Sequence, residues 1–337
     1  MYYNNKDVRL EEMPAPQIGA GEVLLKVLAC GVCGSDVMEW YRINKAPLVL
    51  GHEATGVIVE VGEGVTHFKK GDRVFVSHHV PCNTCHYCLR SNHTVCYTLR
   101  STNFDPGGFA EYVRVPRINV DRGVFLLPDN LSFEDGTLIE PLACVVRGQR
   151  LARIEPGHTV LVIGSGISGL LHVLLARATG AGNVIATDVN EYRLNMAKKF
   201  GADVVIPANE DVPSRMRELN DNRLADLVIV CTGAIPALNT ALQSVDCGGT
   251  VIFFAPTDPG VKLPIRFNDF WRNGLTLLST YGASPIDITT AIELISSKRV
   301  PVHDMITQRL GLAETGHGFK LVADAKESIK VIIEPHK

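Results

Sequence analysis

The sequence predicts an α/β protein of two domains, because its two halves carry different hydrophobic patterns. Its 337 residues are about twice the ~150 typical of one domain. Over residues 23–120, short β-branched runs alternate with glycines, which indicates an irregular, mostly antiparallel β domain. From residue 159 onward, strand-like apolar runs alternate with helical segments, which indicates a doubly wound parallel sheet with helices on both faces.

The change of pattern lies near residues 131–153, where the periodicity becomes helical, with Ser132 as N-cap and Asp135 three residues later. We expect one domain to comprise residues 1–143 and 284–337, interrupted by a second domain at 144–283. The further elements expected are strands at 159–163, 183–187, 203–206, 225–230, 250–254 and 328–333, and helices at 167–179, 191–200 and 312–323.

Composition excludes several classes of protein. The 33 Lys and Arg nearly balance the 36 Asp and Glu, which argues against a nucleic-acid partner. No apolar run reaches the ~18 residues of a membrane span, and the N-terminus has no secretory signal pattern, so we expect a cytoplasmic protein without a membrane partner. The nine cysteines are an odd number for a disulfide framework and need another explanation.

A glycine-rich loop joins an expected buried strand to a helix. Gly164, Gly166 and Gly169 form a G-x-G-x-x-G motif, and Ile167 and Ser168 lie within it. The first glycine permits the tight turn, the second lets the backbone approach a pyrophosphate, and the third lets helix and strand pack. The motif predicts a dinucleotide site at the N-terminus of the helix.

Asp188 ends the next strand, nineteen residues after Gly169, where its carboxylate would accept from the ribose hydroxyls of the cofactor. A carboxylate there repels a 2′-phosphate and favours NAD, whereas nearby Arg193 leaves NADP open. The alternative is a structural turn in which Asp188 caps the helix that begins near Glu191.

Four cysteines fall within residues 82–96, namely Cys82, Cys85, Cys88 and Cys96. Four thiolates in one loop can close a tetrahedral zinc site, and such a site leaves no open position, so its role would be to make the loop rigid. An iron–sulfur cluster is the alternative. His86 and His93 lie among them as possible substitute ligands.

Two further fragments hold residues that can bind a metal ion. Cys33 lies in Cys-Gly-Val-Cys-Gly-Ser-Asp, and His52 and Glu53 lie in Gly-His-Glu-Ala-Thr-Gly. Either fragment alone is as well explained by core packing.

Together with Leu-Ile-Glu140-Pro and the cysteine loop, these fragments resemble the zinc-dependent medium-chain dehydrogenases over nearly the whole chain, in particular the sorbitol and threonine dehydrogenase branches. The resemblance implies a GroES-like β domain that binds zinc and a Rossmann domain that binds NAD, with two zinc ions per chain. It also implies a homotetramer or homodimer. Members usually begin with a few more residues, so the first strand is expected to be short.

Carried over residue by residue, the resemblance makes Cys33 and His52 ligands of a catalytic zinc. Glu53 and Glu140 are both expected near this metal, one as direct ligand and the other through water or by exchange. Cys30 and Cys144 receive no ligand role. The segment with Cys231 and Thr232 is expected to pass the cofactor.

The resemblance also implies that Asp36 orients His52 and that Ser35 takes the substrate proton. Many relatives carry a histidine where this chain has Met38, so their proton path is absent here, and His78 and His79 are possible substitutes.

Substrate contacts are less well defined. Five aromatic residues are candidates for the pocket wall, although aromatic side chains more often pack in a core: Trp40, Tyr41, Phe104, Trp271 and Tyr281. Arg42 and Lys45 leave an anionic substrate open.

The sequence therefore predicts hydride transfer between NAD and a secondary alcohol, such as a polyol, cyclitol or sugar alcohol. The alternatives are a threonine-type amino-alcohol dehydrogenase, a dehydrogenase of a phosphorylated sugar alcohol, and a non-catalytic zinc scaffold, against which the retained Cys33, His52, Glu53 and Glu140 argue.

Overall fold

The computed structural model describes residues 1–263 and 265–337, which divide into two compact units. Unit 1 comprises Met1–Ala143 and Ala283–Lys337, and unit 2 comprises Cys144–Gly282. In the described part of the chain, no helix is long and apolar enough to cross a membrane.

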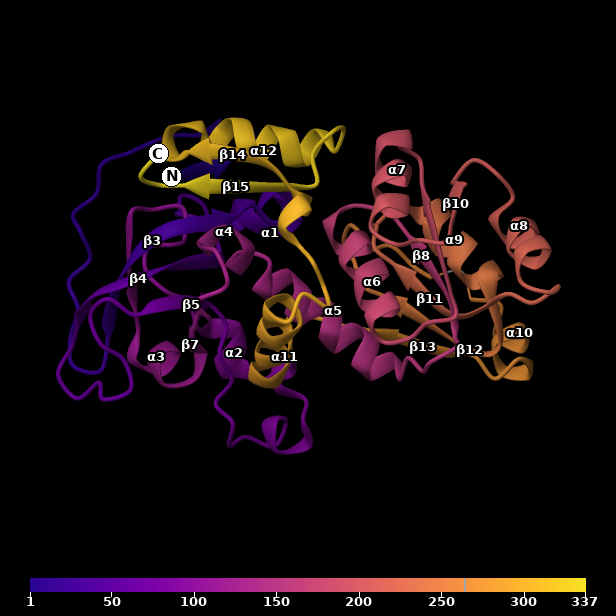
Figure 1. The fold of residues 1–337 in the computed structure, drawn as a ribbon, viewed down its shortest axis with the longest axis horizontal. Helices are drawn as coiled ribbons and strands as arrows, with labels where there is room; N and C mark the ends of the chain where they lie inside the picture. The colour runs from indigo at the N-terminus through magenta and orange to yellow at the C-terminus, as the bar shows by residue number, and fades with distance from the viewer. Residues whose placement is uncertain (264) are drawn as a thin grey trace. The chain divides into compact units, whose positions relative to one another are not determined.

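Unit 1 is built on a seven-stranded sheet in the order β14-β15-β3-β4-β5-β7, with β6 also paired to β3 (Figure 1). All pairs are antiparallel except β14 with β15. Buried apolar residues of β3 alternate with partly exposed ones, so one face of the sheet forms the core. The strands are β3 (Val23–Gly31), β4 (Glu53–Val61), β5 (Arg73–Ser77), β6 (Tyr112–Val115), β7 (Val124–Leu126), β14 (Ile306–Gly311) and β15 (Lys330–Glu334).

Short strands and helices surround this sheet. The terminal strands β1 (Tyr2–Asn4) and β2 (Asp7–Val8) form a separate hairpin. The helices are α1 (Glu39–Arg42), α2 (Tyr97–Ser101), α3 (Arg117–Gly123), α4 (Phe133–Gly136), α11 (Pro285–Ser296) and α12 (Thr315–Asp324), with a 3₁₀ turn at Gly34–Val37.

The helix expected over residues 131–153 is two helices, α4 and α5 (Ile139–Ala152). The Asp135 amide donates to Ser132 Oγ, 2.9 Å away, so the predicted cap is confirmed. A continuous helix is prevented by Pro141, which has no N–H to donate to Thr137 and whose ring would meet that carbonyl group. The expected 312–323 helix similarly begins only at Thr315, after a 3₁₀ turn.

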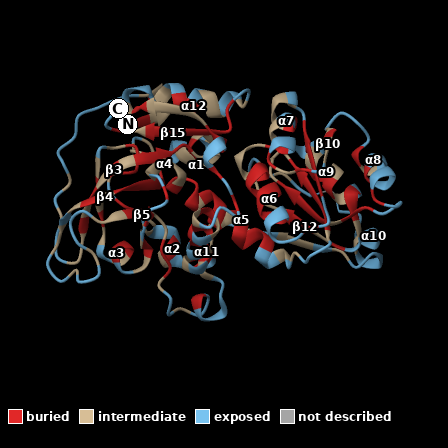
Figure 2. Ribbon diagram, viewed as in Figure 1, coloured by how far each residue is buried: buried red, intermediate tan, exposed pale blue. Residues whose placement is uncertain are grey.

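Unit 2 is a six-stranded parallel sheet in the order β10-β9-β8-β11-β12-β13, with helices on both faces, as the sequence predicted. Helix α6 packs with α7, and α8 packs with α9 (Figure 1). The central strands are buried (Figure 2). The elements are β8 (Thr159–Ile163), α6 (Ile167–Ala178), β9 (Asn183–Asp188), α7 (Glu191–Lys199), β10 (Val204–Pro207), α8 (Val212–Leu219), β11 (Ala225–Val230), α9 (Ile235–Ser244), β12 (Val245–Phe253), α10 (Phe267–Arg272) and β13 (Thr276–Ser279).

An ion pair ties α4 to β14 in unit 1. Arg309 donates from Nε and Nη2 to Glu134 Oε2, at 2.9 and 2.7 Å. This contact lowers the pKa of Glu134 below its ordinary value of 4.5. A lowered carboxyl pKa stabilises the fold above the unfolded-state pKa, and the gain is lost as the pH falls through the folded-state pKa.

We therefore expect Glu134→Gln to lower the free energy of unfolding near pH 7 by about 1 kcal/mol or less, because the pair is partly exposed. The difference from the wild type should shrink as the pH falls below 4.5. Urea unfolding at a series of pH values measures it, with the exposed Glu12→Gln as control. A difference that stays constant down to pH 3 would contradict the ion-pair account.

Candidate metal centres and cofactor site

Three strands of unit 1 bring one group of metal-binding side chains together. β3 ends at Gly31, two residues before Cys33, and β4 begins at Glu53, directly after His52. The register pairs Glu53 with Gly31 on one side and with Ser77 on the other. A side chain at Gly31 would overlap the Glu53 carboxylate and the end of Lys330, so a larger residue there would displace both groups.

The ligand atoms of Cys33, His52 and Glu53 lie within 4.8 Å of one another. Asp36, which is fully buried, organises two of them. Its Oδ2 accepts from the Cys33 amide at 3.0 Å, and its Oδ1 lies 3.4 Å from His52 Nδ1. A carboxylate on one ring nitrogen fixes the imidazole orientation and leaves the other nitrogen for a metal.

The charges in this group favour a bound cation. Burial opposes a charged His52, but the Asp36 and Cys33 charges outweigh it and raise the pKa of His52 well above its ordinary value. The same negative potential attracts a metal ion. A sulfur, an imidazole and a carboxylate are together a donor set that zinc accepts.

Ser35 is held by Arg42, which the sequence did not connect with it. Arg42 donates from Nη2 to Ser35 Oγ at 2.9 Å and from Nε to the Ser35 carbonyl at 3.0 Å. Its Nη2 also lies 3.4 Å from Asp36 Oδ1. Since the guanidinium occupies an acceptor site of Ser35 Oγ, the hydroxyl proton of Ser35 is directed elsewhere.

Lys330 at the start of β15 is the residue of this site that sequence reasoning missed. Its Nζ forms an ion pair with Glu53 Oε2 and donates to the Val32 carbonyl at 3.3 Å, and both charged side chains are 1% exposed. Burial opposes the charge on Lys330, but Glu53, Cys33 and Glu140 raise its pKa above the ordinary value. The available signal in the sequence was a lysine that directly precedes the apolar run Val331–Ile333.

Glu140, in the first turn of α5, is not in the group of mutually close ligand atoms, although its charge acts on Lys330. Its expected place near the metal stays a prediction. Cys30 is buried in β3 and Cys144 lies in α5, and neither belongs to a metal-binding group.

His78 and His79 follow β5 directly and lie against His52. The ring centroids are 4.8 Å apart for His52 and His78, and 3.9 Å apart for His78 and His79. Burial lowers the pKa of His78 well below its ordinary value and that of His79 to about 4, with smaller contributions from neighbouring positive charges. Each has a buried Nδ1 without a hydrogen-bond partner among the described residues.

The four cysteines of the predicted structural site lie together. The Sγ–Sγ distances are 3.9 Å for Cys82 and Cys88, 3.6 Å for Cys85 and Cys88, and 3.6 Å for Cys82 and Cys96. A tetrahedron with Zn–S bonds of about 2.3 Å has edges of about 3.8 Å, which these distances match. All four thiols are free of disulfides.

The backbone of this loop is already arranged for thiolate ligands. Amide groups of Thr84 and Cys85 lower the pKa of Cys82 to about 5, and the Cys85 amide lies 3.2 Å from Cys82 Sγ. His86 instead contacts Arg90 at 2.6 Å, and neither His86 nor His93 belongs to the cysteine group.

The glycine loop of unit 2 joins β8 to α6. Gly164 has a φ of +94°, and a Cβ there would lie 3.2 Å from the Cys231 carbonyl group, so the turn needs a glycine. A Cβ on Gly169 would overlap the Gly164 carbonyl oxygen. At Gly166 the nearest atom to such a Cβ is 3.6 Å away, so the protein itself leaves room there for a ligand. Ile167 and Ser168 form the first turn of α6, at the N-terminal end of its dipole.

Asp188 lies at the carboxyl end of β9, beside this loop. It accepts from the Ser165 amide at 2.7 Å and from the Asn190 amide at 2.9 Å. The alternative in which Asp188 caps the following helix is wrong, because Asn190 is the N-cap of α7 and accepts from the Tyr192 amide at 2.9 Å.

Two further cofactor candidates border the loop. The Arg193 guanidinium lies next to Gly166, and its buried Nε has no hydrogen-bond partner among the described residues. Cys231 follows β11 and donates its amide to the Ile163 carbonyl at 2.8 Å, which places Thr232 beside Gly164. The expected residues therefore surround one end of the parallel sheet, where open α/β sheets bind ligands.

Two family models match most of the chain. The family model described as "Alcohol dehydrogenase GroES-like domain" matches residues 19–129, and the one described as "Zinc-binding dehydrogenase" matches residues 168–297. The sorbitol dehydrogenase of Bacillus subtilis is 32% identical, with 99% of this chain and 96% of that protein covered. The Aspergillus clavatus protein named "Probable D-xylulose reductase A" is 34% identical over 97% of this chain and 93% of its own length.

The chain belongs to the zinc-dependent medium-chain dehydrogenases. A solved structure titled as a zinc-binding dehydrogenase of Sinorhizobium meliloti, bound to NADP, matches it with a TM-score of 0.88 and 28% identity, covering 99% of this chain and 97% of that one. In this dehydrogenase, the cysteine loop and the Cys33, His52 and Glu53 group fit zinc.

The aromatic residues expected to wall the substrate pocket have different surroundings. Phe104 is buried in the core of unit 1, with its ring 6.5 Å from that of His78. Trp40 and Tyr41 contact each other, with ring centroids 5.7 Å apart. Trp271 and Tyr281 lie in unit 2 and are 72% and 45% exposed.

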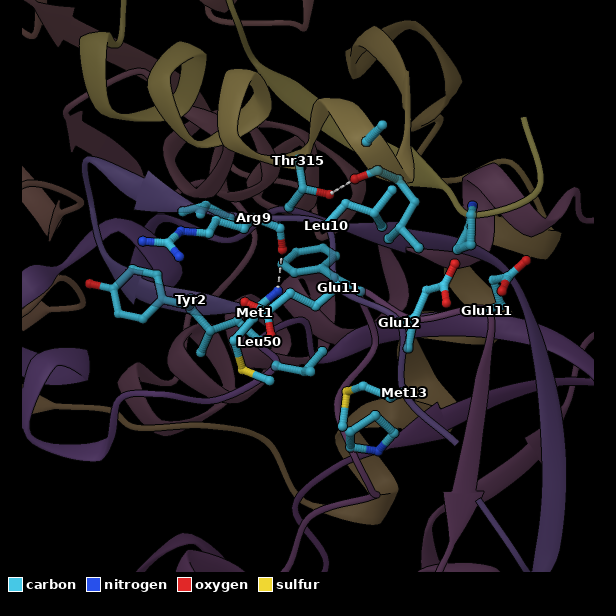
Figure 3. A pocket seen from close by; sticks show the side chains of 18 of the residues that line it. Met1, Tyr2, Arg9, Leu10, Glu11, Glu12, Met13, Leu50, Glu111 and Thr315 are labelled. Carbon is cyan, nitrogen blue, oxygen red and sulfur yellow. Dashed lines mark hydrogen bonds between the residues drawn. The ribbon is translucent and has the colours of Figure 1, made fainter. Parts of the chain in front are cut away.

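A cavity of about 680 Å³ in unit 1 of the dehydrogenase is lined by none of these aromatic residues. Figure 3 shows that Met1, Leu10, Met13, Glu111 and Thr315 border it. None of the expected zinc ligands line this cavity. The volume of a cavity therefore does not identify the active site of this enzyme.

We expect Lys330→Met to destabilise the zinc-depleted dehydrogenase by about 3–5 kcal/mol, because Glu53 would remain buried without its partner. Guanidinium unfolding of the zinc-depleted protein measures this. Restoring zinc should reduce the loss, since the metal compensates the Glu53 charge.

The matched control is Lys320→Met, which removes an exposed lysine from α12 and should change the stability by less than about 0.5 kcal/mol. Equal effects of the two substitutions would contradict the importance of the buried pair.

Proposed function

We propose that this dehydrogenase oxidises a secondary alcohol of the polyol class, with a catalytic zinc in unit 1 and NAD in unit 2. The main observation in support is that the ligand atoms of Cys33, His52 and Glu53 lie together, with the Asp36 carboxylate next to the His52 ring. The relatives named sorbitol dehydrogenase and D-xylulose reductase support a polyol substrate. In this proposal Cys82, Cys85, Cys88 and Cys96 hold a second, structural zinc.

The bound groups supply Lewis acidity and a hydride acceptor, and the chain's own residues do the rest. Asp36 fixes the orientation of His52 and the backbone of Cys33. Ser35 Oγ, held by Arg42, is the hydroxyl group that exchanges the substrate proton. Lys330 balances the charge of Glu53, and the buried surroundings exclude water from both.

For the cofactor, Gly164, Gly166 and Gly169 with the first turn of α6 receive the pyrophosphate. Asp188 accepts from the ribose hydroxyls, because each of its oxygens keeps a further lone pair beyond its amide contact. These features favour NAD, and Arg193 beside Gly166 allows some use of NADP.

We also propose a homo-oligomer, dimer or tetramer, in a reducing compartment such as the cytoplasm. Strand β13 is an edge of its sheet, and the segment before it exposes Phe267 and Trp271 at 69% and 72%. All nine cysteines are free, as a reducing compartment requires.

Light scattering should therefore give a mass at least twice the 36.7 kDa of one chain, and Trp271→Glu should lower it. A monomeric wild type would contradict the oligomer.

The activity test is NADH formation from NAD by the zinc-loaded enzyme with sorbitol, xylitol, myo-inositol, 2,3-butanediol and threonine. We expect turnover on a polyol, abolished by Cys33→Ser and lowered about 10- to 100-fold by Asp36→Asn, which leaves His52 less well oriented. Turnover on threonine alone would move the enzyme to the amino-alcohol branch.

Zinc analysis is the control for these variants. The wild type should hold two zinc ions, Cys33→Ser and Cys85→Ser one each, and the exposed Cys247→Ser two. A wild type with two zinc ions and no turnover on any of these alcohols would contradict the proposed substrate class.

A further inference from the structure

Two basic side chains, Arg42 and Lys45, lie on the segment that follows Ser35 in unit 1. Arg42 and Lys45 both lie against the Tyr41 ring, with Arg42 Cζ 4.7 Å and Lys45 Nζ 5.4 Å from its centroid. The Arg42 guanidinium also donates to Ser35 Oγ at 2.9 Å. Arg42 is therefore in direct contact with the hydroxyl group that we assign to the substrate proton, and Lys45 lies against the same tyrosine ring as Arg42.

The carboxylates of the site do not balance these charges. Asp36 serves both Arg42 and His52, and Glu53 is paired with Lys330. Within the described residues, Lys45 has no ion pair, and Nη1 of Arg42 makes no hydrogen bond. Glu39, on the same helix as Arg42, accepts instead from the Asn5 amide at 3.4 Å.

An independent observation also indicates a polar ligand at this place. The imidazoles of His78 and His79 each leave a buried Nδ1 without a partner among the described residues. The His78 ring lies 4.8 Å from that of His52, and His52 and Arg42 share the Asp36 carboxylate, so the histidines and Arg42 border the same group. Buried polar atoms are generally satisfied, and unsatisfied ones point to a ligand or an ordered water.

We propose that the alcohol substrate carries an anionic group, a carboxylate or a phosphate, which binds to Arg42 and Lys45. This inference rests on the proposed function. A neutral polyol would leave Nη1 of the largely buried Arg42 without a charged partner, whereas Lys45 is exposed and adds to the positive potential. Arg42 Nη1 and Lys45 Nζ donate to the anion, while Arg42 Nη2 keeps Ser35 in place. The anionic group is then separated by only a few carbon atoms from the hydroxyl group that is oxidised.

The experiment compares sorbitol, sorbitol 6-phosphate and gluconate as substrates of the zinc-loaded enzyme with NAD. We expect kcat/KM for one of the two anionic alcohols to exceed that for sorbitol by about tenfold or more, and added salt to reduce this ratio. Comparison of sorbitol 6-phosphate with gluconate shows whether the bound anion is a phosphate or a carboxylate.

The test variant is Lys45→Met, which keeps the aliphatic stem and removes the charge. It should lower the ratio of anionic to neutral kcat/KM about tenfold, Lys45→Arg should restore most of it, and the exposed Lys70→Met should leave it unchanged. Sorbitol as the better substrate, with a ratio insensitive to Lys45→Met, would overturn this inference and leave the proposed function intact.

Binding by calorimetry separates the two proposals if none of these alcohols is oxidised. Tighter binding of an anionic alcohol than of sorbitol, weakened about tenfold by Lys45→Met, would support the anion site and contradict only the proposed reaction. Equal binding of all three would overturn the anion site.

Discussion

The buried Asp36 carboxylate is the contact on which the arrangement of the candidate active site depends. It accepts from the backbone of Cys33, faces the ring of His52 and meets the guanidinium of Arg42. One carboxylate thereby holds two expected metal ligands and the residue that positions Ser35. Because it is fully buried, its charge is poorly screened and acts strongly on all three partners.

A second buried charge joins distant parts of the chain. Lys330 opens β15, near the C-terminus, and reaches Glu53 because β15 pairs with β3 and β3 with β4. Removing one partner of such a pair leaves a buried charge uncompensated, so the C-terminal strand and the metal-binding group depend on one another. Arg42 and Lys45 take no part in this pair, and in our proposal they bind the anionic group of the substrate.

The two expected zinc sites differ in how much of the protein they need. The cysteine loop is local, since its four sulfurs come from residues 82–96 and its own amides stabilise the thiolate of Cys82. The Cys33, His52 and Glu53 group requires the β3–β4 register. A glycine at position 31 is part of this requirement, because a side chain there would overlap Glu53.

The sequence by itself determined the parallel sheet of unit 2, the cysteine loop, the glycine loop and the Ser132 cap, because periodicity, spacing and capping are local properties of the chain. It missed the break between α4 and α5, because the helical periodicity concealed the missing amide of Pro141. Only the tertiary structure decided the partner of Glu53, the contact of Arg42 with Ser35 and the tilted contact between the rings of His78 and His52. These contacts follow from strand pairing and side-chain packing between residues far apart or on different turns, and no sequence spacing encodes them.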